Sequence, residues 1–147
     1  MSAQATLQVR RARSHEEVDA CLDLRRQVFC GEQGVAFEAD RDGRDGEAVH
    51  LVAVAGERVI GTCRLLPAGA EVRLGRMVVK AALRGGGVGT RLLEAADRAC
   101  VELGHDLVVL HAQVAARAVY DRAGYVQRGA PFVEQGIEHV TMEKALA

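Results

Sequence analysis

The chain has 147 residues, a length that suits a single domain, and 49% of them are hydrophobic, enough for a sizeable core. The net charge of −1 argues against nucleic acid or a membrane surface as the main partner. No apolar run approaches membrane-spanning length, and the N-terminus lacks the apolar segment of a signal peptide. We therefore expect one domain over residues 1–147, located in the cytoplasm.

The N-terminal part is expected to form a strand and then a helix. Residues 6–11 alternate between apolar and polar side chains, as a half-buried strand does. Ser14 and Glu17 form a capping box, which marks the start of a helix. The helix should end near Gly31 or Gly34. Its apolar stripe consists of Val18, Cys21, Leu22, Val28 and Phe29.

A polar and acidic loop is expected over residues 32–45. Its charged residues are Glu38, Asp40, Arg41, Asp42, Arg44 and Asp45. For most of these charges the favoured interpretation is a solvated loop. The alternative is a lid that attracts or positions a cationic amine. Glu32 is the best placed for such a role, because it directly follows a helix that packs on the core.

The remainder of the chain alternates strands and helices. Three strands joined by short turns predict an antiparallel meander. The expected segments are strands 49–55, 58–66 and 71–79, helix 92–103, strand 106–112, helix 114–123, and strands 125–128 and 136–143. The element order is then β-α-βββ-α-β-α-ββ, which predicts an α/β fold with a mixed sheet covered by helices.

The four cysteines have no spacing typical of a metal site or a disulfide framework. They are Cys21, Cys30, Cys63 and Cys100. Cys21 and Cys100 fall on apolar helix faces, where a thiol behaves as a small core side chain. We expect free thiols, no bound metal, and the reducing conditions of the cytoplasm.

A glycine-rich turn lies between a strand and the start of a helix. It consists of Arg84, Gly85, Gly86, Gly87, Val88, Gly89 and Thr90. Glycines allow close approach of a ligand, and the unpaired N–H groups and dipole of a helix start attract an anion. The turn is therefore a candidate phosphate or pyrophosphate site; a tight turn without a ligand is the alternative. A P-loop would need lysine after Gly89, and the dinucleotide fingerprint needs glycine or alanine where Thr90 stands.

Two motifs resemble signatures of the GNAT N-acetyltransferase superfamily. Arg84-x-x-Gly87-x-Gly89 matches its Arg/Gln-x-x-Gly-x-Gly/Ala motif, and Tyr120-x-x-x-Gly124-Tyr125 resembles the second signature. The resemblance covers essentially the whole chain. Within the superfamily the chain is similar to the ElaA-like branch, on the segments 26–35, 110–113 and 131–139. The resemblance implies a single GNAT-like domain whose central strands splay apart around the cofactor.

The resemblance also implies acetyl-CoA as cosubstrate, with no metal. The pyrophosphate would lie on residues 84–90, and the pantetheine arm would pair with the backbone of Met77, Val78 and Val79. A backbone N–H of that segment would stabilise the oxyanion. Gln113 stands where many members carry asparagine, and it can still offer an amide to the cofactor. Tyr120 would protonate the departing thiolate; plain core roles for Tyr120 and for the 77–79 strand are the alternatives.

The amine-binding side is less well defined. Candidates for a general base are Glu32, Glu38, His111, Glu134 and His139, and ordered water could replace a dedicated base. Substrate-side candidates are Glu32, Gln33, His111, Glu134 and His139.

Three functions follow from these features. The first is an acetyl-CoA-dependent N-acetyltransferase that acts on a primary amine of a small molecule or peptide. The second is a non-catalytic acyl-CoA-binding or sensing domain. The third, a cofactor-free interaction module, leaves the glycine turn unexplained. No nucleic-acid or membrane partner is expected, and a homodimer stays open.

Overall fold

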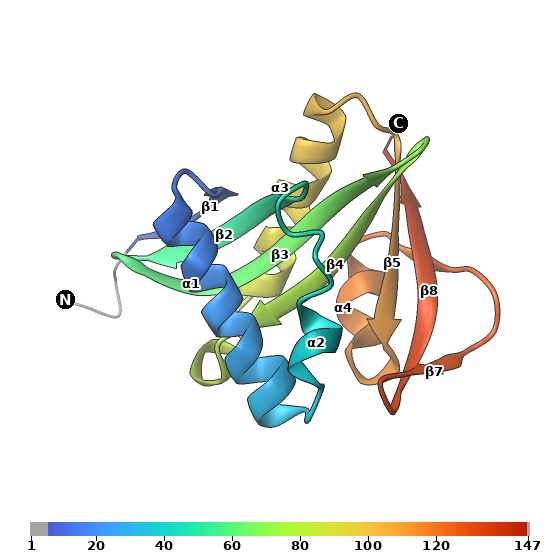
Figure 1. The fold of residues 1–147 in the computed structure, drawn as a ribbon. Helices are drawn as coiled ribbons and strands as arrows, with labels where there is room; N and C mark the ends of the chain where they lie inside the picture. The colour runs from blue at the N-terminus through green and yellow to red at the C-terminus, as the bar shows by residue number, and fades with distance from the viewer. Residues whose placement is uncertain (1–5, 147) are drawn as a thin grey trace.

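The computed structural model describes residues 6–146, which form a mixed eight-stranded sheet with helices on both faces (Figure 1). The strand order is β1-β2-β3-β4-β5-β8-β6, and β7 pairs with β8 beside this path. The strands are β1 (Leu7–Arg11), β2 (Val49–Ala55), β3 (Arg58–Ala68), β4 (Glu71–Val79), β5 (Leu107–Gln113), β6 (Val126–Gln127), β7 (Phe132–Glu134) and β8 (Ile137–Ala145). The predicted α/β fold and meander are confirmed.

The helical segments are more varied in type than the sequence predicted, because π- and 3-10-helical turns accompany the α-helices. They are α1 (His15–Arg25), η1 (Arg26–Glu32), α2 (Phe37–Asp40), η2 (Ala81–Leu83), α3 (Val88–Glu102), η3 (Val114–Ala116) and α4 (Arg117–Arg122). The segment η1 is a π-helix, and it continues α1 to the predicted end of that helix. Ser14 caps the N–H of Glu17 at 3.2 Å, as expected.

Three short elements, α2, η2 and β7, lie where the sequence predicted no helix or strand. The four residues of α2 are too few for a periodic pattern, so sequence reasoning could not find this helix. The strand β7 forms a hairpin with β8 through Gln135 and Gly136, whose φ angles of 52° and 74° fit a type I′ turn. The signal was weak because Asn-Gly or Asp-Gly, rather than Gln-Gly, usually marks such a turn.

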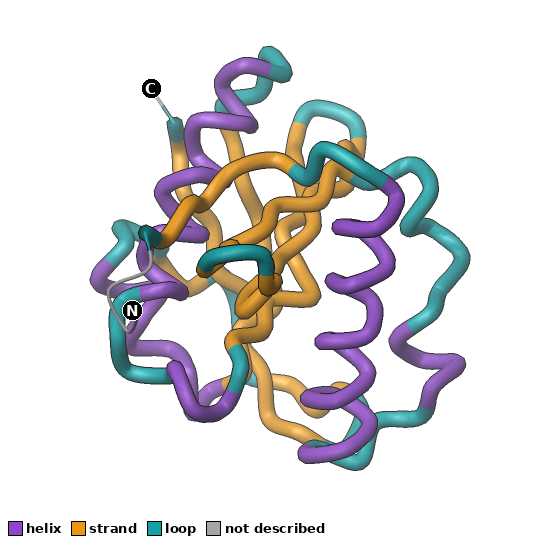
Figure 2. The backbone as a smooth tube through the Cα atoms, turned by 90° about the vertical axis from the view of Figure 1, so that its left-hand side faces the viewer, coloured by secondary structure: helices purple, strands orange, loops and turns teal. Residues whose placement is uncertain are grey.

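The core has two layers because the side chains of the central strands alternate between the faces of the sheet. On one face Leu51 and Ala53 of β2 pack with the apolar stripe of α3. On the other face Val52 and Val54 pack against Cys21 of α1. Figure 2 shows helices on both sides of the strands.

The sheet splits between β4 and β5. Their parallel pairing covers Val72–Leu74 with Val108–Leu110 and stops there. Just beyond, two residues of β4 lie opposite Cys63 of β3, because the register shifts between Thr62 and Arg64. This is a β-bulge, and Arg76 within it has a φ of 53°. A bulge bends its strand, so the end of β4 turns away from β5. The predicted splay is confirmed.

All four cysteines are free; Cys21, Cys63 and Cys100 are buried and Cys30 is half-buried. Burial raises the pKa of all three buried thiols, for Cys100 to about 11, and only a thiolate reacts fast. No helix among residues 6–146 is both long and apolar enough to cross a membrane.

We expect Cys30 to react with iodoacetamide at pH 8 well before the three buried thiols, because it alone is partly exposed. Mass spectrometry of peptides from the native protein measures the order of labelling. The denatured chain, in which all four thiols react, is the control. Alkylation of Cys63 or Cys100 at the rate of Cys30 would contradict the burial.

Candidate active site

A cleft of about 1070 Å³ follows the split between β4 and β5. It brings together most of the residues predicted for the cofactor and the acceptor. Its lining includes Met77, Val78, Val79, Arg84, Gly85, Gly87, Val88, Gly89, Thr90, Gln113 and Tyr120, together with Gln33, His111, Glu134 and His139. Gly86, Glu32 and Glu38 do not line it.

The glycine turn leads directly into α3, which begins at Val88, four residues earlier than predicted. Gly87 is the N-cap, with a φ of 87° that only glycine adopts easily, and no side chain caps the helix. The N–H groups of Val88, Gly89 and Thr90 therefore lack both an intrahelical partner and a capping side chain. A diphosphate group fits this set of donors and the positive end of the helix dipole.

Arg84 is anchored rather than free. Its Nε donates to the carbonyl of Val79 at 2.9 Å, and its Nη1 lies 2.9 Å from a carboxylate oxygen of Glu32. On the other side of the split, Nε2 of Gln113 donates to Oε1 of Gln33 at 2.9 Å. Glu32 and Gln33, at the end of η1, thus contact both sides of the split, and Glu32 is committed to Arg84 rather than to an acceptor.

The end of β4 offers its backbone to the cleft while its side chains pack inward. Val78 is 4% exposed and packs with Leu24 and Val28. Within residues 6–146, the β5-facing edge of β4 from Gly75 to Val79 has no strand partner. An extended, peptide-like arm can pair with such an edge, so the core role and the binding role of this segment are compatible.

Tyr120 lies across the cleft from β4. Its side chain is 9% exposed, and its hydroxyl donates to Sδ of Met77 at 3.8 Å. Burial raises the pKa of this phenol to about 12, so it stays protonated at neutral pH. The hydroxyl is thus a hydrogen-bond donor that already faces a sulfur atom, which suits a donor to the sulfur of a thioester.

Three of the acceptor-side candidates converge at the other end of the cleft. Nδ1 of His111 lies 3.3 Å from Oε2 of Glu134, and Nε2 of His139 lies 3.9 Å from Oε1. Nδ1 of His139 donates to the carbonyl of Ile137 at 2.7 Å. The ring of Phe132 packs against both imidazoles. Across the described residues, no three His, Cys, Asp or Glu side chains form a group that could hold a metal ion.

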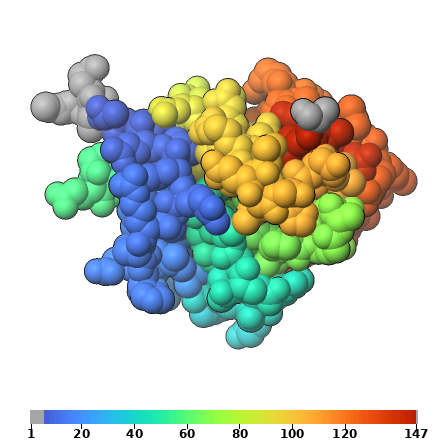
Figure 3. All heavy atoms as spheres, turned by 90° about the horizontal axis from the view of Figure 1, so that it is seen from above, coloured from blue at the N-terminus to red at the C-terminus, as the bar shows by residue number. Residues whose placement is uncertain are grey.

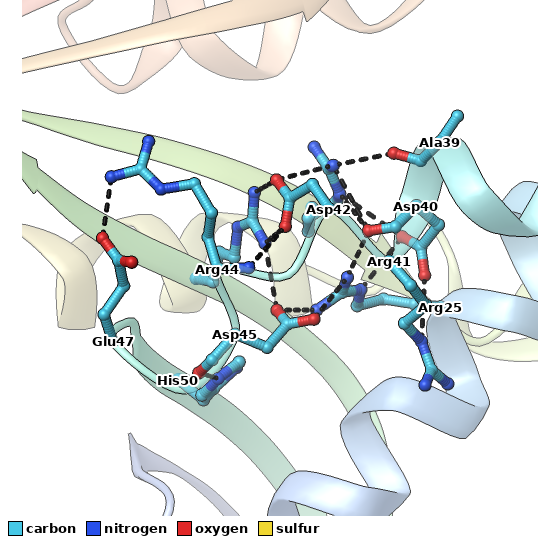
Figure 4. Close-up of polar contacts among 11 residues, drawn as sticks. Arg25, Ala39, Asp40, Arg41, Asp42, Arg44, Asp45, Glu47 and His50 are labelled. Carbon is cyan, nitrogen blue, oxygen red and sulfur yellow. Dashed lines mark hydrogen bonds and ion pairs between the residues drawn. The ribbon is translucent and has the colours of Figure 1, made fainter.

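The acidic loop after η1 differs from both interpretations of its sequence. Most of its aspartates are neither solvated nor free to act in a charged lid. Asp40, Asp42 and Asp45 form ion pairs with four guanidinium groups (Figure 4). The partners are Arg25 of α1, Arg41 in the loop, Arg64 of β3 and Arg76 of β4. Seen from above, the loop lies against α1 (Figure 3). These three aspartates are neutralised, so they do not attract a cationic amine.

Sequence reasoning missed the three arginines of this network that lie outside the loop, Arg25, Arg64 and Arg76. Arg25 is 1% exposed and Asp40 is 2% exposed, so their pair is withdrawn from water. The sequence did indicate this buried arginine. Arg25 follows Cys21 by four residues and precedes Val28 by three, so it lies on the same apolar face of the helix. A charge at such a position requires a buried partner.

Comparisons with known proteins agree with this geometry. Residues 11–146 match the family described as Acetyltransferase (GNAT) domain. The crystal structure of an acyl-CoA N-acyltransferase from Pseudomonas aeruginosa is similar, with 32% identity, 95% and 99% of the two chains covered, and a TM-score of 0.83. Escherichia coli ElaA has 28% identity, the same coverage, and a TM-score of 0.83. An aminoglycoside 6′-N-acetyltransferase solved with coenzyme A shares the fold at 15% identity, 95% and 97% coverage, and a TM-score of 0.77.

The bulged, split sheet and the glycine turn at a helix start are the features of an acyl-CoA-dependent acyltransferase. The chain belongs to the GNAT acetyltransferase family, as residues 11–146 establish. Its relatives include ElaA, as the sequence resemblance implied.

Proposed function

We propose that the protein is an acetyl-CoA-dependent N-acetyltransferase that moves an acetyl group to the primary amine of a small molecule or peptide. The observation that carries the proposal is the cleft itself. One cavity joins a helix start with free N–H groups, the unpaired backbone edge of β4, the hydroxyl of Tyr120 and a cluster of basic and acidic side chains. Coenzyme A bound to a protein of the same fold supports the choice of cofactor.

The reaction follows from this order of groups along the cleft. The amine nitrogen attacks the thioester carbon, and a backbone N–H of the 77–79 segment stabilises the oxyanion. When the C–S bond breaks, the hydroxyl of Tyr120 donates its proton to the thiolate sulfur. The nitrogen then gives up its extra proton, which restores the phenol through solvent. The products from a free amine are an N-acetyl amide and coenzyme A with a free thiol; an acceptor that starts as the ammonium ion also releases one proton to solvent before the attack.

The alternative is a domain that binds acyl-CoA without turnover. The protonated hydroxyl of Tyr120 in the cleft favours the enzyme, because mere binding of the thioester needs no donor there. Release of coenzyme A from acetyl-CoA, measured across a panel of amines, separates the two functions. Turnover supports the enzyme, and saturable binding without turnover for every amine supports the sensor. The absence of both contradicts the proposal.

A valine at Gly87 should weaken acetyl-CoA binding about 10- to 100-fold, the cost of losing one charge-assisted hydrogen bond of about 1.5–3 kcal/mol. The Cβ would meet no atom within 4 Å, so the defect arises from the positive φ and from the blocked approach of phosphate rather than from a clash. Isothermal titration calorimetry with coenzyme A measures the affinity.

Gly86→Ala is the matched control for this substitution. Gly86 belongs to the same turn but does not line the cleft, and a Cβ there would make only an ordinary 3.5 Å contact with the carbonyl of Leu83. We expect its affinity for coenzyme A to stay at the wild-type value. A folded Gly87→Val protein with unchanged affinity would move the pyrophosphate site elsewhere.

A further inference from the structure

We propose that the acceptor is a primary amine that also carries an anionic group, a carboxylate or a phosphate. His111, oriented by Glu134, takes the proton of the ammonium group, and Arg73 binds the anion. This inference rests on the proposed function, because it describes the acceptor end of the same cleft. All three side chains line that cleft.

The hydrogen bond to Glu134 fixes the tautomer of His111. Nδ1 faces a carboxylate oxygen at 3.3 Å, so this nitrogen carries the proton. The lone pair of the neutral imidazole is then on Nε2. The side chain of His111 is 41% exposed, so it is open to an incoming ammonium group. A carboxylate behind an imidazole also stabilises the imidazolium that forms when Nε2 accepts a proton.

His139 is not equivalent to His111. Its side chain is 9% exposed, its Nδ1 is committed to the carbonyl of Ile137, and its Nε2 is 3.9 Å from Glu134, beyond hydrogen-bond range. Its ring stacks on Phe132, which in turn contacts His111 edge-on. His139 therefore belongs to the support behind the base. Among the candidates, geometry selects His111 as the proton acceptor.

Arg73 stands on the same face of the sheet as His111. It is in register with Val109 of β5, two residues before His111, and side chains two residues apart share a face. With strands ~4.8 Å apart and a rise of ~3.3 Å per residue, the two Cα atoms are about 8 Å apart. An acceptor with a few bonds between its amine and its anionic group can span that distance.

The charges around this end of the cleft favour an acceptor whose second charged group is an anion rather than another ammonium group. Arg64 and Arg76 on β3 and β4 are paired with aspartates of the loop. The side chain of Arg73 has no hydrogen bond or ion pair to any of residues 6–146, although Arg73 lines the cleft. The aspartates of the opposite wall are already paired with guanidinium groups, so these aspartates offer no free carboxylate to a polycation (Figure 4).

Proton and electron transfer balance in this scheme. Nε2 of His111 takes one proton from the ammonium, which frees the nitrogen lone pair. That lone pair forms the C–N bond as the C–S bond breaks, and the thiolate keeps the bonding electrons and gains a proton from Tyr120. The second proton leaves the nitrogen when the amide forms and restores the phenol through solvent, while the imidazolium of His111 releases the first proton to solvent.

The test measures the acetylation of anionic and neutral acceptor amines by the wild-type protein and by four variants. The probes are α-amino acids and aminoalkyl phosphates against the matching amino acid amides and amino alcohols. We expect wild-type kcat/KM to favour the anionic amines by about tenfold or more, the value of one good charge-assisted contact. Arg73→Gln should remove that preference by raising KM for the anionic acceptors, with KM for the neutral ones nearly unchanged.

His111→Gln should lower kcat/KM by about 10²–10⁴-fold at pH 7, the usual value of general base catalysis. Added imidazole, or a rise in pH that deprotonates the amine in solution, should restore part of the loss. Charged groups around His111 that could shape this profile are Glu134, His139 and Arg73. Glu134→Gln should give a smaller loss of the same kind. Glu138→Gln, an exposed neighbour on β8, should act as wild type.

Equal turnover of anionic and neutral amines, or His111→Gln with wild-type kcat/KM, would overturn this inference and leave the proposed function standing. Failure of the wild-type protein to acetylate any amine would overturn both. If His111→Gln does not fold, as judged by its thermal unfolding midpoint, the exposed positions Arg73 and Glu134 decide the matter through their own variants.

Discussion

Tyr120→Phe is expected to lower kcat by about 10²–10⁴-fold while the affinity for coenzyme A stays nearly intact. The substitution removes only the hydroxyl that donates to the departing sulfur and keeps the ring in the core. Burial holds the pKa of Tyr120 at about 12, so the group is a donor from neutral pH up to about pH 11. Steady-state kinetics, calorimetric binding and thermal unfolding of the same preparation make the measurement.

The structure removes the main confounding effect of this substitution. The hydroxyl of Tyr120 donates to Sδ of Met77, a weak acceptor, so its loss leaves no strong partner unsatisfied. Tyr125→Phe is the matched control, because this neighbouring tyrosine is also buried, does not line the cleft, and has a hydroxyl without a hydrogen-bond partner among the described residues. A folded Tyr120→Phe protein with wild-type turnover would exclude Tyr120 from the chemistry.

Arg25→Ala is expected to lower the free energy of unfolding by about 3–5 kcal/mol, because it leaves Asp40 and Asp45 without their shared buried partner. Urea denaturation at pH 7 measures the change. Arg44→Ala is the control: its ion pair with Glu47 is exposed and screened by water, so little change in the free energy of unfolding is expected. A loss below about 1 kcal/mol for Arg25→Ala would mean that the remaining arginines alone satisfy the two carboxylates.

Because of the same network, the free energy of unfolding should decrease at acid pH. Burial opposes ionisation of Asp45, but its hydrogen bond and ion pair with Arg25 prevail and lower its pKa. The hydrogen bond from Arg64 holds the pKa of Asp42 far below its usual range. An aspartate whose pKa is lowered by folding stabilises the folded protein. This stabilisation is complete above the pKa of the unfolded chain, about 3.9, and is lost as the pH falls toward the pKa of the folded protein. In Arg25→Ala the contribution of Asp45 to this pH dependence of stability should be smaller.

The element order and the cofactor end of the cleft could be predicted from local sequence. A strand, a glycine turn and an amphipathic helix are contiguous, so residues 71–103 carry the whole signal for a diphosphate site. The capping box at Ser14 is equally local, because a serine side chain reaches the N–H three residues ahead. The π-helical turn η1 was not predictable, since its residues continue the same helical periodicity as α1.

The acceptor end was decided by tertiary structure. His111 and Glu134 are 23 residues apart and meet only because β7 folds back on β8, beside β5. The partners of the loop aspartates likewise come from α1, β3 and β4, so a charge pattern that looked solvated became an ion-pair network. The sequence by itself determined which backbone turns can bind a phosphate, because that depends on neighbouring residues. Which charged side chains stay unpaired depends on the oppositely charged side chains that the tertiary structure brings next to them.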